Sequence, residues 1–160
     1  MKNLFLPAAL AAVLLSVTGI AGANDDLDGL NTANGRLVHD FLDLWFNQHK
    51  PREAFDKYVS RDNYVDHAVY SGSTRKKQTF ESERAFESKM PLDPKLRFVF
   101  RQIISQGDLV VSHIQIVNGH SKYGDEMVEI ERVRDGKIVD HWDIHAPLKQ
   151  DSMVFVNLDH

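Results

Sequence analysis

Apolar side chains in the first half of the chain recur at the spacing of a helix. Between residues 31 and 49 they fall every three or four positions, and Pro51 ends the run. Proline is also tolerated at the first position of a helix, so residues 51–58 are predicted to form a second, short helix. A third run with one apolar face spans 73–90. The spacing therefore predicts three amphipathic helices.

The second half of the chain changes to the alternation of apolar and polar residues that is typical of strands. The predicted strands are 95–105, 109–117, 126–134 and 137–145, with a short strand or strand end within 63–69. Connections this short require antiparallel neighbours. Asp135-Gly136 favours a type I′ hairpin turn, since glycine accepts a positive φ.

Helices followed by an antiparallel meander predict an α+β domain, in which helices cover one face of a curved sheet. A pocket is expected between the two layers. The folded domain is assigned to 34–146, with a flexible leader at 24–33 and a C-terminal tail or edge strand at 147–160.

Residues 1–23 have the layout of a secretory signal peptide. Lys2 precedes an apolar stretch, and the small residues Ala21-Gly22-Ala23 form a cleavage site. The alternative, a retained membrane anchor, is disfavoured because Pro7 and several polar or small residues interrupt a barely sufficient length. The sequence predicts a periplasmic or secreted protein with no membrane contact after cleavage.

Charge and cysteine content exclude some partners and covalent links. The net charge is −4, and the chain has no long basic run, so nucleic acid is not an expected partner. There is no cysteine, so the domain must fold without disulfides.

The hairpin around Asp135-Gly136 places several polar side chains on one face of a strand. Because side chains alternate along a strand, His141, Asp143 and His145 share one face while Trp142 takes the other. This is a candidate acid/base or ligand cluster. A metal site on these three residues is disfavoured, since they span about 13 Å along one strand, too far to meet one ion.

Asp143 is the leading acid/base candidate, because burial in an apolar pocket would raise its pKa towards neutrality. The alternative is a structural ion pair with Arg97 or Arg101 on a neighbouring strand. His113 lies within an apolar strand and is either a hydrogen-bonded core residue or a pocket residue. Glu129 and Glu131 alternate with apolar residues and point either to solvent or into the pocket.

Three segments resemble SnoaL-like proteins of the nuclear transport factor two-like, cystatin-like superfamily. They are Tyr64-Val65-Asp66-His67, Gly107-Asp108-Leu109-Val110 and the hairpin from Arg132 to Asp143. The resemblance covers roughly residues 34–146. It implies a cone formed by a strongly bent sheet around the N-terminal helices, with a pocket at one end.

The resemblance also implies chemistry without a cofactor. In SnoaL-like cyclases an aspartate acts as acid/base with an assisting histidine, and Asp143 with His67 or His113 match these positions. The same scaffold serves other reactions and plain binding, so the fold alone assigns no reaction.

Five further residues are candidates for contact with a small hydrophobic organic molecule. The Tyr64 hydroxyl could stabilise an oxyanion, and Phe98 is expected in the core or pocket wall. The remaining candidates are Trp45, Trp142 and His141, although packing is the alternative for both tryptophans.

The resulting hypothesis is an exported domain that binds a small organic molecule and catalyses aldol-type condensation, isomerisation or dehydration by acid/base chemistry. The alternative is a non-catalytic periplasmic binding or dimerisation module. A homodimer is compatible with both.

Overall fold

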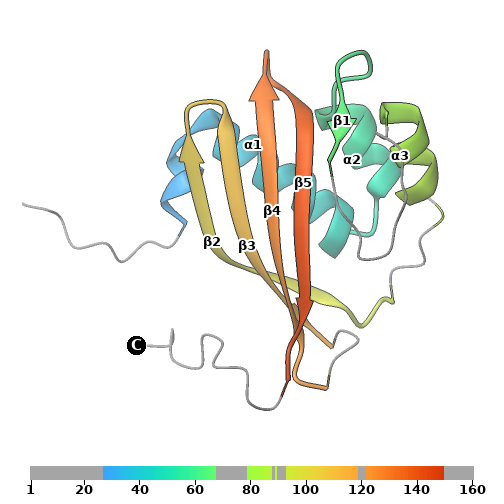
Figure 1. Ribbon diagram of the computed structural model, residues 1–160, viewed down its shortest axis with the longest axis vertical. Coiled ribbons are helices and arrows are strands. Elements are labelled where there is room, and N and C mark those ends of the chain that lie inside the picture. Colours follow the sequence, from blue (N-terminus) through green and yellow to red (C-terminus); the bar gives the residue numbers. More distant parts are fainter. Residues whose placement is uncertain (1–26, 68–78, 88, 90–92, 119–121, 150–160) are drawn as a thin grey trace, which may run out of the picture.

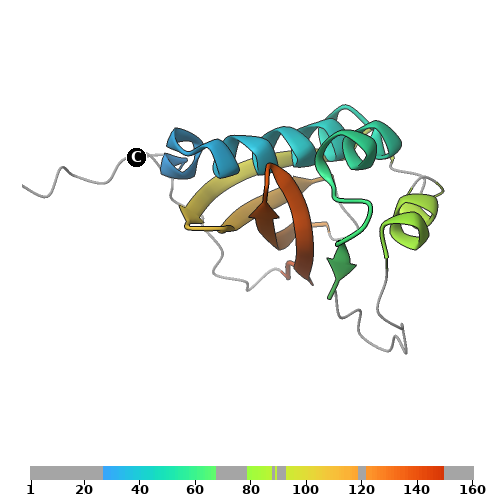
Figure 2. The ribbon, with the colours of Figure 1, turned by 90° about the horizontal axis from the view of Figure 1, so that it is seen from above.

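The computed structural model describes residues 27–67, 79–87, 89, 93–118 and 122–149. The predicted signal peptide, the start of the leader and the end of the tail lie outside these residues. Within them, one helical layer lies across one face of a curved sheet (Figures 1 and 2). This is the predicted α+β arrangement.

The helical layer begins with the 3₁₀ turn η1 (Asp28–Asn31) and α1 (Ala33–Leu42). Thr32 caps α1, because its hydroxyl accepts a hydrogen bond from the Gly35 amide at 2.9 Å. A π-helical segment, η2 (Asp43–Asn47), continues α1 in place of the uniform helix predicted for 31–49.

Pro51 opens the second helix, α2 (Pro51–Tyr58), over the predicted range. The third helix, α3 (Phe80–Glu87), is shorter than the range 73–90 predicted for it, part of which lies outside the described residues. No helix in the described part of the chain has the length and apolar character needed to cross a bilayer.

The sheet has five strands in the order β1-β5-β4-β3-β2. Their bounds are β1 (Val65–Asp66), β2 (Arg97–Gln106), β3 (Leu109–Val117), β4 (Asp125–Arg134) and β5 (Lys137–Pro147). The four long strands form the predicted antiparallel meander, whereas the short β1 pairs with β5 in parallel. Asp135 and Gly136 have φ values of 51° and 69°, as a type I′ turn requires.

The strand register separates the two faces of the sheet. Ser112, Glu129 and Asp143 are direct neighbours across β3, β4 and β5, so they share a face. We call it the concave face, because its apolar members, Val110 and Ile114 among them, pack with the helices in one buried core. The opposite side, the outer face, carries the alternate residues of each strand.

Candidate functional site

Buried polar side chains gather on the concave face near β1 and β5. We define the concave cluster as Asp66, Glu129, Glu131, His141 and Asp143. The exposed fraction is 5% for Asp66, 2% for Glu129, 0% for Glu131 and 6% for His141. Charged groups are rarely buried this completely unless a partner or function requires it. The cluster is therefore the first place to look for chemistry.

Strand pairing explains how the cluster forms. In the antiparallel β4·β5 pair, Glu129 lies opposite Asp143 and Glu131 lies opposite His141. The parallel β1 then places Asp66 beside His141 from the other side of β5. Three strands thus bring together residues that are up to 77 positions apart in sequence.

His141 is held between two carboxylates. Its Nδ1 lies 3.2 Å from Asp66 Oδ1, and its Nε2 lies 2.5 Å from Glu129 Oε2. Burial by itself lowers the pKa of His141, but the charge of Glu129 and hydrogen bonds to both carboxylates outweigh burial. The pKa of His141 is therefore well above its usual value.

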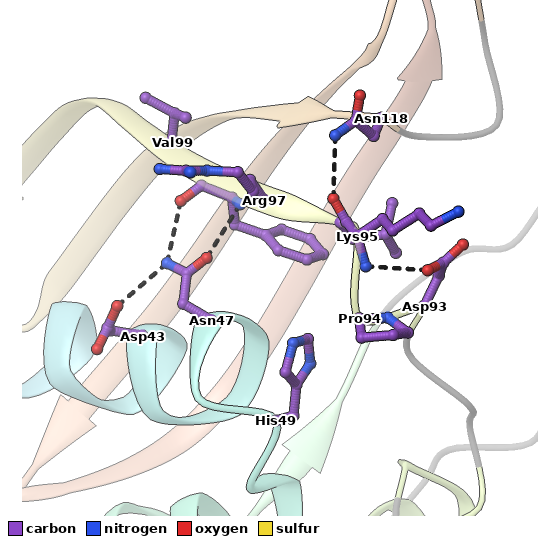
Figure 3. Close-up of a pocket in the computed structure, with 11 residues that line it drawn as sticks. Asp43, Asn47, His49, Asp93, Pro94, Lys95, Arg97, Val99 and Asn118 are labelled. Carbon is purple, nitrogen blue, oxygen red and sulfur yellow. Dashed lines mark hydrogen bonds between the residues drawn. The ribbon is translucent and has the colours of Figure 1, made fainter.

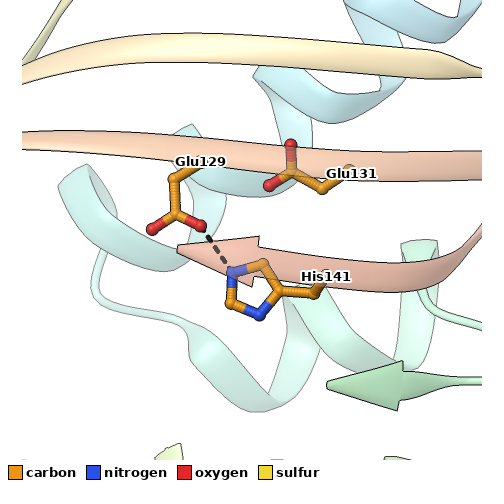
Figure 4. Close-up of side chains that lie close together, drawn as sticks. All are labelled: Glu129, Glu131 and His141. Carbon is orange, nitrogen blue, oxygen red and sulfur yellow. Dashed lines mark hydrogen bonds and ion pairs between the residues drawn. The ribbon is translucent and has the colours of Figure 1, made fainter. Parts of the chain in front are cut away.

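Glu131 is fully buried, and no hydrogen bond within the described residues offsets the burial of its carboxyl group. Neither of its carboxylate oxygens has a hydrogen-bond partner among the described residues, and Figure 4 shows the group beside Glu129 and His141. Burial raises the pKa of Glu131 well above its usual value, and the charge of Glu129 raises it further, while His141 opposes the shift.

Asp143 lies at the more open end of the cluster and is half-buried. Burial raises its pKa first, and the neighbouring Glu129 charge raises it further, while His141 acts in the opposite direction. The alternative ion pair with Arg101 is disfavoured, because both Nε and Nη2 of that guanidinium donate to Gln115 Oε1.

Tyr64 is buried, and the carboxylates of the cluster also affect the pKa of its hydroxyl. Burial, followed by the charges of Asp66, Glu83, Glu129 and Glu131, raises its pKa well above its usual value. The hydroxyl therefore stays protonated and can donate a hydrogen bond near the cluster.

A groove of about 560 Å³ follows β5, and most of its lining residues lie on the outer face of the sheet. His67, Trp142 and Ile144 line it on the outer face, and Asp143 and His145, at the alternate positions of β5, complete this part of the lining. Its lining is mainly apolar, through Leu109, Ile130 and the two outer residues of β5. Asp143 thus borders an apolar hollow and the buried cluster together.

His67 and Trp142 lie together on the outer side of this groove. Their rings are stacked with centroids 4.5 Å apart, and His67 Nε2 lies 2.8 Å from Asp140 Oδ1. Asp143 and His67 therefore line one hollow, but His67 is paired with Asp140 and not with Asp143.

His113 does not join this arrangement. It pairs in register with Val128, one position away from the Ser112–Glu129–Asp143 row, so it lies on the outer face. Its Nε2 contacts the Glu126 carboxylate on the neighbouring strand. The sequence-based grouping of His113 with Asp143 is not supported, because the one-residue offset puts them on opposite faces.

The other two candidate contacts belong to the hydrophobic core. Trp45 is 5% exposed and packs against Phe41, Phe46 and Phe55. Phe98 is 7% exposed and stacks on Phe46 with ring centroids 4.5 Å apart. Of the five candidate contact residues, only Tyr64, His141 and Trp142 lie at the cluster or the groove.

A second hollow, of about 820 Å³, lies where η2 meets the start of β2 (Figure 3). Asn47 links the two elements there: its side-chain amide donates to the Phe98 carbonyl at 3.0 Å and accepts from the Phe98 amide at 3.0 Å. The same amide group donates to Asp43 at 3.1 Å. These hydrogen bonds hold the helix against the sheet, so the polar side chains of this hollow have a structural role. The hydrogen bonds of His141 in the concave cluster instead join strands to one another.

Sequence reasoning missed part of the cluster. Asp66 was not a candidate, and Glu129 and Glu131 were left undecided between solvent and pocket. Glutamates at every second position of a strand usually indicate a solvated face. The signal that could have located them is the register of the hairpin, which puts them opposite His141 and Asp143.

The family model of the SnoaL-like domain matches residues 38–141, so the chain belongs to the SnoaL-like family. The match includes both glutamates of the cluster, Asp66 and His141, and it ends just before Asp143. No curated protein matches the chain.

Solved structures of the nuclear transport factor two-like superfamily share the fold. A protein from Jannaschia sp. assigned as a SnoaL-like polyketide cyclase is 15% identical, covers 71% of this chain and 85% of its own, and has a TM-score of 0.58. IdmH from Streptomyces antibioticus, assigned as a polyketide cyclase, is 21% identical over 70% of this chain and 91% of its own, with a TM-score of 0.55.

AclR from Streptomyces galilaeus, assigned as a hydroxylase, is 17% identical over 71% of this chain and 78% of its own, with a TM-score of 0.53. At these identities the likeness establishes the fold. The different reactions assigned to these structures mean that this chain's function must be argued from its own site.

Proposed function

We propose that this protein binds a small, mainly apolar organic molecule in the groove along β5 and catalyses proton transfer on it with Asp143 as acid/base. The observation that carries the proposal is the position of Asp143, which borders both the apolar groove and the buried cluster. A carboxylate at such a boundary can reach a ligand while it is shielded from bulk water.

The surroundings of Asp143 suit proton transfer to or from carbon. Partial burial and the nearby Glu129 keep its pKa above that of an exposed aspartate, which makes the carboxylate a stronger base than an exposed one. The protonated Tyr64 hydroxyl is a candidate donor to an enolate oxygen formed near the cluster.

His67 and Trp142 would hold the ligand and leave the proton transfer to Asp143. Their stacked rings form the outer wall of the groove, and an aromatic wall binds planar organic molecules by apolar contact. The cyclase assignments of the Jannaschia and Streptomyces antibioticus structures favour carbonyl compounds with acidic carbon–hydrogen bonds, and the reaction would be an aldol-type condensation, isomerisation or dehydration.

The test is proton exchange measured by nuclear magnetic resonance in deuterated water, with β-keto esters such as ethyl benzoylacetate as probes. The protein should accelerate deuterium uptake above the spontaneous rate, and Asp143→Asn should lower that acceleration by about 10²- to 10⁴-fold, the usual contribution of a general acid/base. Asp135→Asn is the matched control, because Asp135 sits in an exposed turn.

Two results would count against the proposal. Equal acceleration by wild type and Asp143→Asn would remove Asp143 from the chemistry. Tight binding of a copurified organic molecule, identified by native mass spectrometry, without any exchange in wild type would favour a binding module.

The binding-module alternative has its own supporting observation, two exposed apolar side chains on the outer face. Ile104 and Ile144 are 50% and 63% exposed there, and the described helices all lie on the other side of the sheet (Figure 2). A homodimer through this face would bury these residues. Light scattering during size-exclusion chromatography tests it, with Ile144→Lys expected to weaken association.

A further inference from the structure

The floor of the concave cluster contains a donor set that the proton-transfer proposal does not use. Glu129, Glu131 and His141 each offer one ligand atom, and these three atoms lie within 4.8 Å of one another. They come from two adjacent strands, with Glu129 and Glu131 two residues apart on β4 and His141 facing them from β5 (Figure 4).

We propose that Glu129, Glu131 and His141 form a binding site for one divalent transition-metal ion such as Zn²⁺ or Mn²⁺. Two carboxylates and one imidazole are ligands that these ions accept. Ligand atoms on one such ion lie at about 2.1 Å from it, hence at most about 4.2 Å apart. Small side-chain rotations of the three residues would close the site.

The second, independent observation is Glu131 itself. Its side chain is 0% exposed, and both oxygens are without a hydrogen-bond partner among the described residues. An orphaned carboxylate in the core costs several kcal/mol in other proteins unless a charge compensates it. The group lies beside the Glu129–His141 pair, where an ion would sit.

The charges of the cluster also favour a bound cation. Four carboxylates, those of Asp66, Glu129, Glu131 and Asp143, surround a single imidazole in the cluster. The hydroxyl of Ser112, also buried and unpartnered within the described chain, faces Glu129 across β3 and β4. A divalent cation supplies the positive charge that these groups lack.

Asp66 would act as a positioning residue for this ion. It lies 3.2 Å from Nδ1 of His141, which leaves Nε2 to face Glu129 and the ion. A carboxylate that accepts the second N–H of a ligating histidine fixes the ring orientation and the tautomer, and its loss weakens metal binding about 10- to 100-fold in other metalloproteins.

Three protein ligands leave coordination positions open, as in metal sites that bind a water or a substrate. Asp143 is opposite Glu129 in register and borders the groove, whereas the three proposed ligands do not line it. The metal site does not rest on the function proposed for Asp143, and either can hold without the other.

The test uses untagged full-length protein that has been dialysed against EDTA. Isothermal titration with ZnCl₂ and with MnCl₂ should show one ion per chain, and Co²⁺ should give visible absorption bands from a protein-bound ion. Glu131→Gln is expected to lower affinity at least tenfold, and Asp66→Asn about 10- to 100-fold.

The matched control is Glu126→Gln, which changes a carboxylate on the same strand but on the outer face. It should leave the affinity within about twofold of wild type, since it removes no ligand. Absence of stoichiometric binding to wild type overturns the proposal, and so does equal binding by Glu131→Gln and Glu126→Gln.

Circular dichroism verifies that each variant is folded. If Glu131→Gln does not fold, the contrast between Asp66→Asn and Glu126→Gln decides the matter, and equal affinities there also overturn the site. A failure of metal binding together with normal Asp143-dependent deuterium exchange would leave the function proposed above intact.

Discussion

The two faces of one sheet carry histidine–carboxylate pairs with different surroundings. On the concave face, His141 is 6% exposed and sits between Asp66 and Glu129. On the outer face, His113 contacts Glu126, and both side chains are 13% exposed. The comparison shows that similar residue pairs in one sheet acquire different partners and burial through the face they occupy.

The largest expected effect is the loss of the concave imidazole. His141→Ala should lower the free energy of unfolding by about 3–5 kcal/mol, because it removes the partner of buried carboxylates. His113→Ala should cost about 1.5 kcal/mol, the order of one charge-assisted hydrogen bond. Urea denaturation of both variants at neutral pH measures the difference. Equal losses would mean that the two faces are energetically alike.

A second prediction concerns the two glutamates of β4 in protein free of metal. Glu131→Gln should raise the free energy of unfolding at pH 8 by on the order of 1 kcal/mol, since burying this carboxylate's charge opposes folding. Glu126→Gln should lower it, because the substitution weakens the contact with His113. Denaturant titrations in EDTA compare them, and a loss of stability in Glu131→Gln would contradict the account.

The increase in the free energy of unfolding expected for Glu131→Gln depends on pH in a definite direction. The pKa of Glu131 in the folded protein is raised above its ordinary value of 4.5, so the folded state binds this proton more tightly than the unfolded chain. Wild type therefore loses stability relative to Glu131→Gln as the pH rises above about 4.5 and through the raised pKa. At pH 4 the advantage of the variant should vanish.

The smallest expected effect lies at an exposed ion pair far from both histidines. Arg84 donates two hydrogen bonds to Asp56, at 2.7 and 2.9 Å, and lowers the pKa of that carboxyl. Asp56→Asn should cost little, because solvent screens exposed pairs. The loss should be present at neutral pH and disappear as the pH falls through the pKa of Asp56. A cost as large as that of His141→Ala would refute the contrast between buried and exposed pairs.

The elements were predictable because local patterns determine them. Pro51 marks the start of α2, and Asp135-Gly136 adopts the positive φ angles expected of its turn. The alternation in β3, β4 and β5 gave their bounds to within two residues. Such signals depend only on neighbours in sequence.

The face of each polar residue was harder to predict. In β4, Val128 and Ile130 have the composition of a core face, yet they lie on the outer face while Glu129 and Glu131 are buried. Alternation identifies two faces but does not say which is covered. The helices cover the face that carries the glutamates, which sequence spacing alone does not reveal.

The site was predicted in part for the same reason. Asp143 and His141 were predicted because they lie two residues apart on one strand. That prediction does not require knowing which strands pair. Asp66 reaches His141 only through the parallel β1·β5 pairing. The sequence disfavoured a metal site on three ligands of one strand, whereas the donor set in the structure spans β4 and β5.

The most direct test of the account compares one variant from each face in the deuterium-exchange assay. Asp143→Asn is expected to lose at least about 100-fold of the catalysed rate, as expected for a general acid/base. His113→Gln, on the outer face, is expected to stay within about twofold of wild type, since it touches neither the groove nor the cluster. A large loss in His113→Gln with an unchanged rate in Asp143→Asn would contradict the assignment of function to the concave face.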